Sequence, residues 1–397
     1  MKALFLLTLT APLSLFAILI LRLISSFRPV RISKIRADRF GHFIAHPILC
    51  HERNLRTNGI GLYWIEGEVC NQFWRSFLNR HLTIHGFIKW IDLWNRAIPG
   101  GRHIEDFPTN YIWDVDLRQV NREAPTMPFT SNDETLGRNW LSARGFAPSQ
   151  RLVCLHVRDS AFLKSTQPDV DWSYHDYRDS VIENFEKGVR WLLDQNIFVI
   201  RAGSIAERPL NIQHKNFIDL PFSEHRNDFI DIWLWAVCDM GITSTSGPHL
   251  VMNFYNTNWL CVDQAPITAI VKCAPGIVAP KPMTNGITDE PQCFWVTSVP
   301  LNSQQEIGKN MGYRPLSKDE IYEIIKEAWS FYSDPKPKKE YHDESPKQFW
   351  KEWFALISRT GEGNAFLSSS GIHQLHPQFK ISQFWLKNLS GLNNNVG

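Results

Sequence analysis

Short apolar segments alternate with amphipathic ones through the second half of the chain, and this alternation limits the possible folds more than any other feature of the sequence. The predicted strands are residues 151–157, 197–200, 217–220, 240–243 and 259–262, and the predicted helices between them are residues 179–196, 228–238 and 248–256. Strands that alternate with helices connect through right-handed crossovers and form a parallel sheet. Ligands of such sheets bind at the carboxyl ends of the strands. The pattern therefore predicts an α/β fold with its functional residues at that edge.

The first half of the chain shows a weaker form of the same pattern. Residues 30–37 and 61–67 read as strands, and a helix that begins at residue 43 is predicted to be interrupted at Pro47. At 397 residues the chain is long enough for two domains and an appendage. The predicted divisions are an anchor helix at 1–28, an amino-terminal Rossmann-like domain at 29–145, a carboxyl-terminal Rossmann-like domain at 146–317 and a helical tail at 318–397, which begins with a helix capped by Ser317.

The amino terminus has the composition of a membrane segment. Residues 3–21 carry no charged side chain, and at about 1.5 Å per residue a helix of this length spans the hydrocarbon core of a bilayer. Arg22, Arg28 and further basic residues follow the run, which by the positive-inside rule keeps the rest of the chain in the cytoplasm. A cleaved signal peptide and a helix that lies in the membrane interface are the alternative interpretations.

The composition excludes some classes of partner and of site. Forty-two Lys and Arg against 40 Asp and Glu leave a net charge of +2, so nucleic acid is not an expected partner and any anion must meet a local site. The seven cysteines are scattered and never form C-x-x-C. This pattern favours reduced thiols in a cytosolic compartment over a disulfide framework or a zinc ribbon.

Charged side chains follow the predicted strand 151–157 at once. His156 lies at its end, and Arg158 and Asp159 come next, where a parallel sheet presents its ligand crevice. The planar guanidinium of Arg158 can clamp a phosphate, while Asp159 can orient that guanidinium or bind a sugar hydroxyl. A surface Arg–Asp pair at a loop entry is the alternative.

Two further strand ends repeat this polar pattern. Strand 197–200 runs into Arg201, Gly203 and Ser204, so Arg201 is predicted as a second arginine of a phosphate clamp. Strand 240–243 leads through a turn into a helix, and the turn carries Ser244, Thr245, Ser246, Gly247 and His249. Backbone N–H groups at a helix start, together with hydroxyls, can bind an anion, although a simple helix cap is the alternative. The absence of G-x-x-x-x-G-K-[ST] and of G-x-G-x-x-G argues against a P-loop NTPase and a typical dinucleotide enzyme.

Gly41 and His42 lie where the first predicted strand meets a helix. An imidazole at this position can take a proton from an attacking hydroxyl at neutral pH, and a capping or buried histidine is the alternative. His42 and His46 also have the i, i+4 spacing of a helical metal pair, with His51 beyond them. Pro47 interrupts this helix and no carboxylate lies between the two as in H-E-x-x-H, so no metal site is predicted, and a metal-dependent hydrolase built on His42, His46 and His51 is the alternative.

Residues 172–180 combine aromatic and charged side chains just before a helix. Asp179 is predicted to cap that helix, whereas Tyr177 and Arg178 are left open between capping and closing over a sugar or base.

Several of these motifs together resemble a family of bacterial glycosyltransferases associated with surface-carbohydrate gene clusters. The motifs are RFGH at 39–42, HVRDSAF at 156–162, YRDSVIENF at 177–185, IRAGS at 200–204 and ITSTSGPHLVMNFYNTNWLCVDQAP at 242–266. The chain is similar, more distantly, to the fucosyltransferase superfamily, whose H-x-R-R strand end uses arginine on the donor diphosphate. Asp159 replaces the second arginine of that motif here.

The resemblance implies a GT-B-like arrangement of two Rossmann-like parallel-sheet domains. It implies that the carboxyl-terminal domain holds a nucleotide-sugar and that the acceptor approaches from the amino-terminal one. It also implies that no cofactor or metal is permanently bound. With the membrane segment predicted above, the expected location is a bacterial inner membrane.

The expected function is the transfer of a sugar from a GDP- or UDP-sugar to a surface glycan or a lipid-linked acceptor. His42 is the expected base, Arg158 and Arg201 the expected diphosphate clamp. The alternative is a non-catalytic, membrane-associated glycan-binding or scaffold protein that keeps the fold of a transferase.

Overall fold

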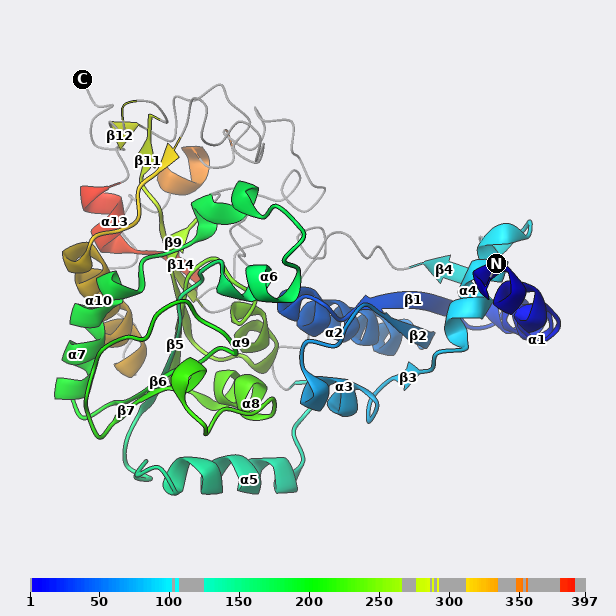
Figure 1. The fold of residues 1–397 in the computed structure, drawn as a ribbon, viewed down its shortest axis with the longest axis horizontal. Helices are drawn as coiled ribbons and strands as arrows, with labels where there is room; N and C mark the ends of the chain where they lie inside the picture. The colour runs from blue at the N-terminus through cyan, green and yellow to red at the C-terminus, as the bar shows by residue number, and fades with distance from the viewer. Residues whose placement is uncertain are drawn as a thin grey trace. The chain divides into compact units, whose positions relative to one another are not determined.

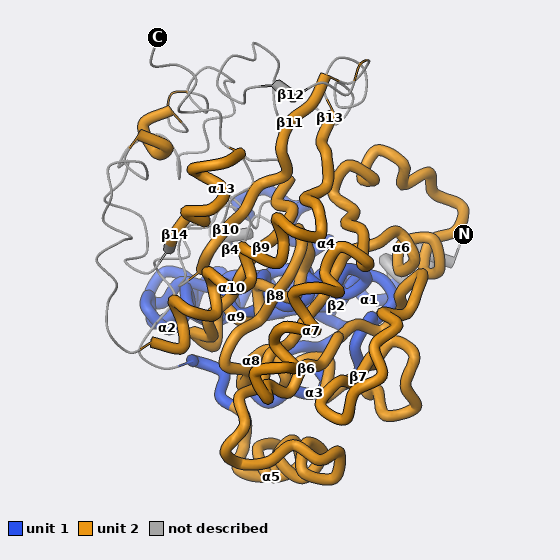
Figure 2. Tube along the Cα trace, turned by 90° about the vertical axis from the view of Figure 1, so that its left-hand side faces the viewer, with its two compact units in different colours: residues 1–128 blue, residues 129–397 orange. Residues whose placement is uncertain are grey.

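The computed structural model describes most of the chain and divides it into two compact units. The described residues are 2–101, 104–106, 125–265, 276–285, 288, 291–292, 312–334, 348–352, 355 and 379–389. Unit 1 comprises residues 1–128 and unit 2 residues 129–397 (Figure 2).

Unit 1 is built on a parallel sheet in the order β3-β2-β1-β4. Its strands are β1 (Val30–Arg36), β2 (Ile60–Glu66), β3 (Thr83–Ile84) and β4 (Ile104–Asp106), and its helices are α1 (Lys2–Ser25), α2 (Phe40–Arg56), α3 (Gln72–Leu78) and α4 (Ile88–Ala97). The strands predicted at 30–37 and 61–67 are confirmed. β1 is buried along most of its length, as is typical of a parallel strand covered on both faces.

Helix α2 continues through Pro47, so the predicted interruption is wrong. A proline has no N–H to donate to the carbonyl four residues earlier, which here belongs to Phe43. The indole Nε1 of Trp74 donates to that carbonyl at 2.8 Å, and the orphaned acceptor is thereby satisfied.

Helix α1 packs on unit 1 along one side. Ile18 is 1% exposed and belongs to a core cluster with Val30 and Ile32 of β1 and with residues of α4. The Nη1 of Arg22 donates to the carbonyl of Pro99 at 2.6 Å and ties the end of α1 to the loop after α4. In the part of the chain that the structure describes, no helix combines the length and the apolar character needed to cross a bilayer.

Unit 2 is built on a seven-stranded sheet in the order β14-β10-β9-β8-β5-β6-β7, in which every pair is parallel. Its strands are β5 (Leu152–His156), β6 (Phe198–Arg201), β7 (Phe217–Asp219), β8 (Met240–Thr243), β9 (Trp259–Gln264), β10 (Gly276–Pro280) and β14 (Phe379–Ile381). A small antiparallel sheet is formed by β11 (Met283–Thr284), β12 (Pro291–Gln292) and β13 (Gly312–Tyr313). The predicted α/β class with parallel sheets is confirmed.

Helices cover both faces of the large sheet (Figure 1). The helices of unit 2 are α5 (Ser131–Ser142), α6 (Ala161–Thr166), α7 (Glu186–Asp194), α8 (Ile230–Val237), α9 (His249–Tyr255), α10 (Lys318–Ser333) and α13 (Gln383–Asn388), with a 3₁₀ helix η4 (Ser173–Arg178) before α7. α7 and α10 lie on one face of the sheet, and α8 and α9 lie on the other (Figure 1).

The strand order has a reversal beside β5. From β5 the chain moves outward to β6 and β7, and it then returns to β8 on the opposite side of β5. Helices on the two sides of such a reversal lie on opposite faces of the sheet, which opens a crevice at the carboxyl ends of the two strands. The carboxyl ends of β5 and β8 are therefore where this fold most readily holds a ligand.

The boundaries of unit 2 differ from the predicted domain divisions. α5, expected within 29–145, packs in unit 2 with Gly137 against the indole of Trp233. α10, expected in a separate tail, is capped by Ser317 as predicted and buries Ile324 and Ile325 in unit 2. The remaining residues of the predicted tail lie mainly outside the described part of the chain.

Candidate functional site at the carboxyl edge of unit 2

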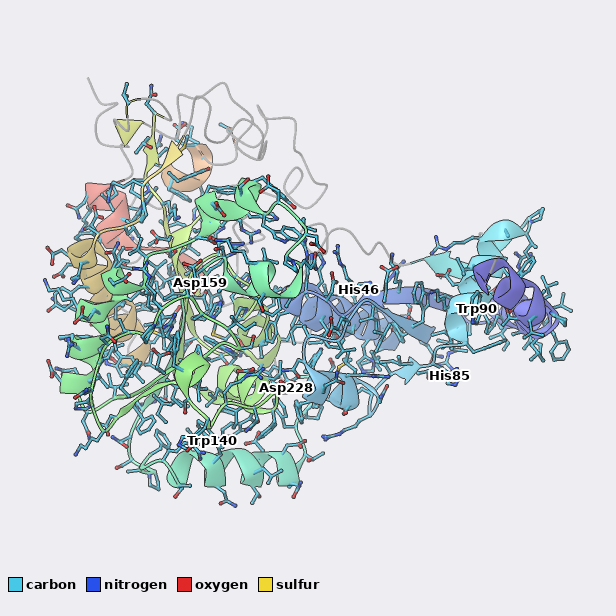
Figure 3. The ribbon with its side chains drawn as sticks, viewed as in Figure 1. His46, His85, Trp90, Trp140, Asp159 and Asp228 are labelled. Atoms are coloured by element: carbon cyan, nitrogen blue, oxygen red, sulfur yellow. The ribbon has the colours of Figure 1, made fainter. Side chains whose placement is uncertain are left out.

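The ends of β5 and β8 are tied together by hydrogen bonds at the reversal of strand order. The backbone N–H of Arg158 donates to Oγ of Ser244 at 2.7 Å, and the N–H of Ser244 donates to the carbonyl of His156 at 3.1 Å. The loop that contains Arg158 is therefore held against the turn that follows β8. Figure 3 labels the next residue, Asp159, at this edge of the sheet.

The guanidinium of Arg158 pairs with Asp179. Nη1 donates to Oδ1 of Asp179 at 2.6 Å, and only 12% of the Arg158 side chain is exposed. The backbone reinforces this pair, because the N–H of Ser180 donates to the carbonyl of Arg158 at 2.9 Å. Asp179 was predicted only as a cap, and the spacing of 21 residues between the partners gives no local signal of their contact.

Asp159 has a different role from the expected one. Its Oδ1 accepts from the N–H of Ala161 at 3.0 Å, and its Oδ2 accepts from the N–H of Glu207 at 2.9 Å. Ser160 donates to Oε1 of Glu207 at 2.6 Å beside this contact. The carboxylate of Asp159 thus joins the loop after β5 to the loop after β6, and the expected pairing with Arg158 is replaced by Asp179.

Lys281 brings a buried cation to the same edge. It follows β10 directly and is 2% exposed, and its Nζ donates to the carbonyls of Tyr177, at 2.9 Å, and Asp179. Burial lowers the pKa of Lys281. The sequence analysis did not identify Lys281, although the buried run of β10 that ends in a lysine was a usable signal.

The electrostatics of the edge depend on two carboxylates. Burial raises the pKa of Asp179 to about 6, against the lowering effect of the Arg158 guanidinium. Burial also raises the pKa of Asp263, which lies at the end of β9 and whose Oδ1 accepts from the N–H of Leu316 at 2.8 Å. Lys281 opposes both shifts, so it is the common electrostatic partner of the two acids.

The hydroxyl-rich turn after β8 is partly structural. Ser244 and Thr245 are 0% and 1% exposed. Oγ1 of Thr245 donates to the carbonyl of Asp263 at 3.2 Å and accepts from the N–H of Ala265 at 2.9 Å. Ser246 and Gly247 are half-buried and remain the part of the turn that a ligand can reach.

Helix α9 follows this turn, with Pro248 as its cap residue and no side-chain capping bond. It has only seven residues, and the N–H groups of Leu250 and Val251 donate to the carbonyls of Gly247 and Pro248, so the helix start is a weaker anion site than the sequence predicted. Burial lowers the pKa of His249 to about 4, so its imidazole is neutral at pH 7, and its ring packs against Trp259 with centroids 5.9 Å apart. The Nη2 of Arg178 reaches the carbonyl of Thr245 at 3.5 Å and adds another cation near the turn.

Arg201 is engaged inside unit 2. It is 2% exposed, its Nη1 donates to the carbonyl of Arg208 at 2.7 Å, and it forms an ion pair with Asp219 of β7 at 3.2 Å. The structure therefore directs the Arg201 guanidinium to the β7 side of the sheet, and the expected clamp with Arg158 is not formed in this conformation.

The neighbours of Arg201 pack closely. Gly203 has φ +139°, and a Cβ there would lie 3.2 Å from Nδ1 of His156, so this position requires glycine. Nδ1 of His156 lies 3.1 Å from the carbonyl of Ala202, and burial lowers the pKa of His156 to about 4. Ser204 is half-buried.

In unit 1 the histidines predicted from the sequence lie on α2. Gly41 and His42 are half-buried in its first turn. His46 is 4% exposed, and burial together with the nearby His42 lowers its pKa to about 4. Within the described residues, no three His, Cys, Asp or Glu side chains form a group that could hold a metal ion.

Comparisons with known proteins give two remote structural likenesses. No protein-family model matches the sequence, and no curated protein matches it. The chain is similar to the glycosyl transferase family 9 structure from Veillonella parvula DSM 2008, with 9% sequence identity and a TM-score of 0.47 over 76% of this chain and 97% of that one. It is also similar to the E. coli ADP-heptose LPS heptosyltransferase II structure, with 9% identity and a TM-score of 0.36 over 58% of this chain and 84% of that one. Because identities and scores are this low, the function of the chain is inferred from its own residues.

Proposed function

We propose that the chain is a glycosyltransferase that binds the diphosphate of a nucleotide-sugar at the carboxyl ends of β5 and β8. The observation that carries the proposal is the placement of Arg158, which the strand-order reversal, the bond to Ser244 and the pair with Asp179 hold at the carboxyl ends of β5 and β8. The presence of two units, each with a parallel sheet, and the motif resemblance described above support the same reaction class.

The positive charge at this edge fits a diphosphate leaving group, which gains negative charge as its bond to the anomeric carbon breaks. Asp179 accepts from Nη1 of Arg158, and a guanidinium has further N–H donors in the same plane. Lys281 and Arg178 add positive charge from the neighbouring segments. In a partly buried site such preorganised charge stabilises a developing diphosphate without reorganisation at the moment of reaction.

The reaction would be a single displacement at the anomeric carbon. An acceptor hydroxyl forms the new C–O bond as the bond from the anomeric carbon to the diphosphate breaks, and the hydroxyl proton passes to a base. His42 is our proposed base, Arg158 the group that stabilises the leaving diphosphate, and Ser246 with Gly247 the backbone that contacts it. We assign Arg201 to positioning the β6 end rather than to the clamp, and we propose that no metal is needed.

The proposed class of acceptor rests on the predicted attachment of the chain to a membrane. We propose a surface-glycan or lipid-linked acceptor and a site that faces the cytoplasm. Five of the cysteines lie in the described part of the chain, and all five are free thiols, which is typical of a reducing compartment.

A non-catalytic binding protein with the same fold is the second candidate. It is favoured by the engagement of Arg201 with Asp219, which leaves fewer cations for a diphosphate than the sequence predicted. The two functions differ in what stabilises the folded state. Stabilisation by GDP, UDP or their sugars in a thermal-shift panel supports the transferase, whereas stabilisation by oligosaccharide alone supports the binder.

Turnover with a panel of nucleotide-sugars tests the transferase directly. We expect Arg158→Ala to lose about 2 to 4 kcal/mol of transition-state stabilisation in kcat/KM. Arg190→Ala is the matched control, because Arg190 pairs with Glu186 on the exposed side of α7. Equal kcat/KM in wild type and Arg158→Ala would remove the basis of the proposal.

A further inference from the structure

Helix α1 has two faces with different surroundings within unit 1. Ser14 and Ile18 are 0% and 1% exposed, and Leu21 and Ile24 continue the same side one and two turns later. This side packs against the core of β1 and against α4, which lies beside α1 (Figure 1). The packed face therefore belongs to the interior of unit 1.

The opposite face of α1 is apolar and exposed. Its side chains and their exposed fractions are Leu9 65%, Leu13 66%, Phe16 65%, Leu19 69%, Ile20 42% and Leu23 67%, and Phe27, two residues beyond the end of α1, is 87% exposed. Five of the positions within α1 follow one another at spacings of four and three residues, which places them along one side of a helix. A contiguous stripe of large exposed apolar side chains marks an interaction surface rather than scattered surface residues.

Basic residues outnumber acidic ones in α1 and in the elements that contact it. The helix end and the neighbouring helix α4 carry Arg22, Arg28, Lys89 and Arg96. The acids in these elements are Asp92, which is 5% exposed and pairs with Arg96, and Glu105 and Asp106 of β4. Half-buried Trp90 of α4 adds an aromatic ring with a polar N–H, a side chain suited to a membrane interface (Figure 3). Apolar side chains bordered by cations fit an anionic lipid surface.

We propose that the exposed face of α1 lies in the interface of an anionic membrane, parallel to its surface, and attaches unit 1 to it. The packed face argues against a helix that spans the membrane. Lipid around the whole helix would require removing Ile18 and Leu21 from the core of unit 1. The predicted membrane segment thus becomes an interfacial helix, one of the alternatives that the sequence left open. This inference does not depend on the proposed transferase activity.

Flotation of the full chain with lipid vesicles tests the proposal. We expect binding to vesicles of phosphatidylcholine with phosphatidylglycerol, and weaker binding to phosphatidylcholine alone. The triple variant Leu13→Gln, Phe16→Gln and Leu23→Gln should lower the partition coefficient by about 100-fold or more, because each change removes a large apolar side chain from the lipid contact. Its thermal midpoint should match that of wild type, because these side chains make no core contacts.

A matched control replaces exposed apolar residues elsewhere. The variant Leu55→Gln, Leu136→Gln and Val170→Gln changes side chains that are 56%, 52% and 45% exposed and should bind vesicles like wild type. Equal binding by the two triple variants would overturn the proposal. So would a dimer in sedimentation velocity that dissociates in the α1 variant without any vesicle binding, because a second copy would then cover the stripe.

Extraction of bacterial membranes separates an interfacial helix from a spanning one. We expect alkaline carbonate to release the full-length chain. Retention of the chain in the carbonate-washed membrane would contradict the interfacial placement.

Discussion

Asp179 sets the charge that a ligand meets at Arg158. Above pH about 6 the carboxylate is ionised and offsets the guanidinium, and as the pH falls through about 6 it takes up a proton and leaves the Arg158 charge uncompensated. We expect the affinity for a nucleotide-sugar to rise as the pH falls through this value, since a diphosphate diester has no monoester proton that titrates there. Calorimetric titration of wild type at several pH values measures this dependence.

Asp179→Asn isolates the cause of that pH dependence. The amide keeps the shape of the side chain and leaves the backbone carbonyl that Lys281 contacts. We expect the variant to bind the nucleotide-sugar more tightly at neutral pH, by about tenfold, with a flat profile around pH 6. Asp169→Asn removes one exposed charge nearby and should keep the wild-type profile. An unchanged profile in Asp179→Asn would show that another group is responsible.

The same carboxyl affects folding stability in a defined direction. The folded pKa of Asp179 is raised from its ordinary value of 3.8 to about 6, so between these values the folded chain binds more protons than the unfolded one. Its contribution to the free energy of unfolding is therefore largest at low pH and is lost as the pH rises through about 6.

Arg201 was predicted to bind the donor diphosphate, whereas in the structure its guanidinium pairs with Asp219. Burial raises the pKa of Asp219, and the ion pair with Arg201 compensates for that burial. Arg201→Ala leaves Asp219 without its cation, and we expect a loss of about 3 to 5 kcal/mol in the free energy of unfolding. Chemical denaturation measures this loss. Arg208→Ala, whose side chain is 62% exposed, should cost about 1 kcal/mol or less.

The opposite result would restore a functional role to Arg201. If Arg201→Ala kept its stability and lost nucleotide affinity as Arg158→Ala does, the guanidinium would have to leave Asp219 for the ligand.

For single residues, the sequence indicated which side chains lie at the carboxyl edge of the sheet better than it indicated which side chains they contact. Arg158 was identified because charge follows an apolar strand directly, and this logic is local. Its pairing with Asp179 and the contacts of Lys281 depend on segments that only the folded chain brings together. Lys281 was missed because the strand before it was not recognised.

At the scale of elements, one close helix contact offers a test of packing. A Cβ at Gly137 of α5 would lie 2.3 Å from the ring of Trp233 in α8. Gly137→Ala gains up to about 1 kcal/mol in helix propensity but forces a large, fully buried indole to move, which costs about 1 to 3 kcal/mol or more. We expect a net loss of stability in chemical denaturation.

Gly188→Ala in α7 is the matched comparison. A Cβ there would lie 2.4 Å from Cδ1 of Ile325, the end of a flexible side chain that can rotate away. Gly188→Ala should therefore lose less stability than Gly137→Ala. The reverse order would show that α5 packs differently on α8.

The elements themselves were largely predictable. Local sequence patterns predict the buried strands, which consist of β-branched and apolar residues. They also predict the start of α10 through its Ser317 capping box. The continuation of α2 through Pro47 was not predictable, because it depends on Trp74 supplying a donor from another helix.

At the scale of the whole chain, the sequence showed two α/β parts but misplaced their limits. The alternation of strands and helices marks each sheet, whereas α5 and α10 join unit 2 through tertiary contacts of Gly137 and Ile325 that no local pattern reports. The interpretation of α1 as a membrane-spanning helix also changed once its contacts in unit 1 were known. Its apolar run reads as a membrane segment, yet one side of it completes the core of unit 1.

Hydrogen exchange of the full chain, with and without a nucleotide-sugar, shows which segments the bound diphosphate protects. If the diphosphate binds at the loops that carry Arg158 and Ser246, the ligand should slow amide exchange in the loops after β5 and β8 and leave the interior of the α7–α10 contact unchanged. In Arg158→Ala this protection should disappear at the same ligand concentration. Protection confined to other segments, or protection that survives in Arg158→Ala, would contradict the account.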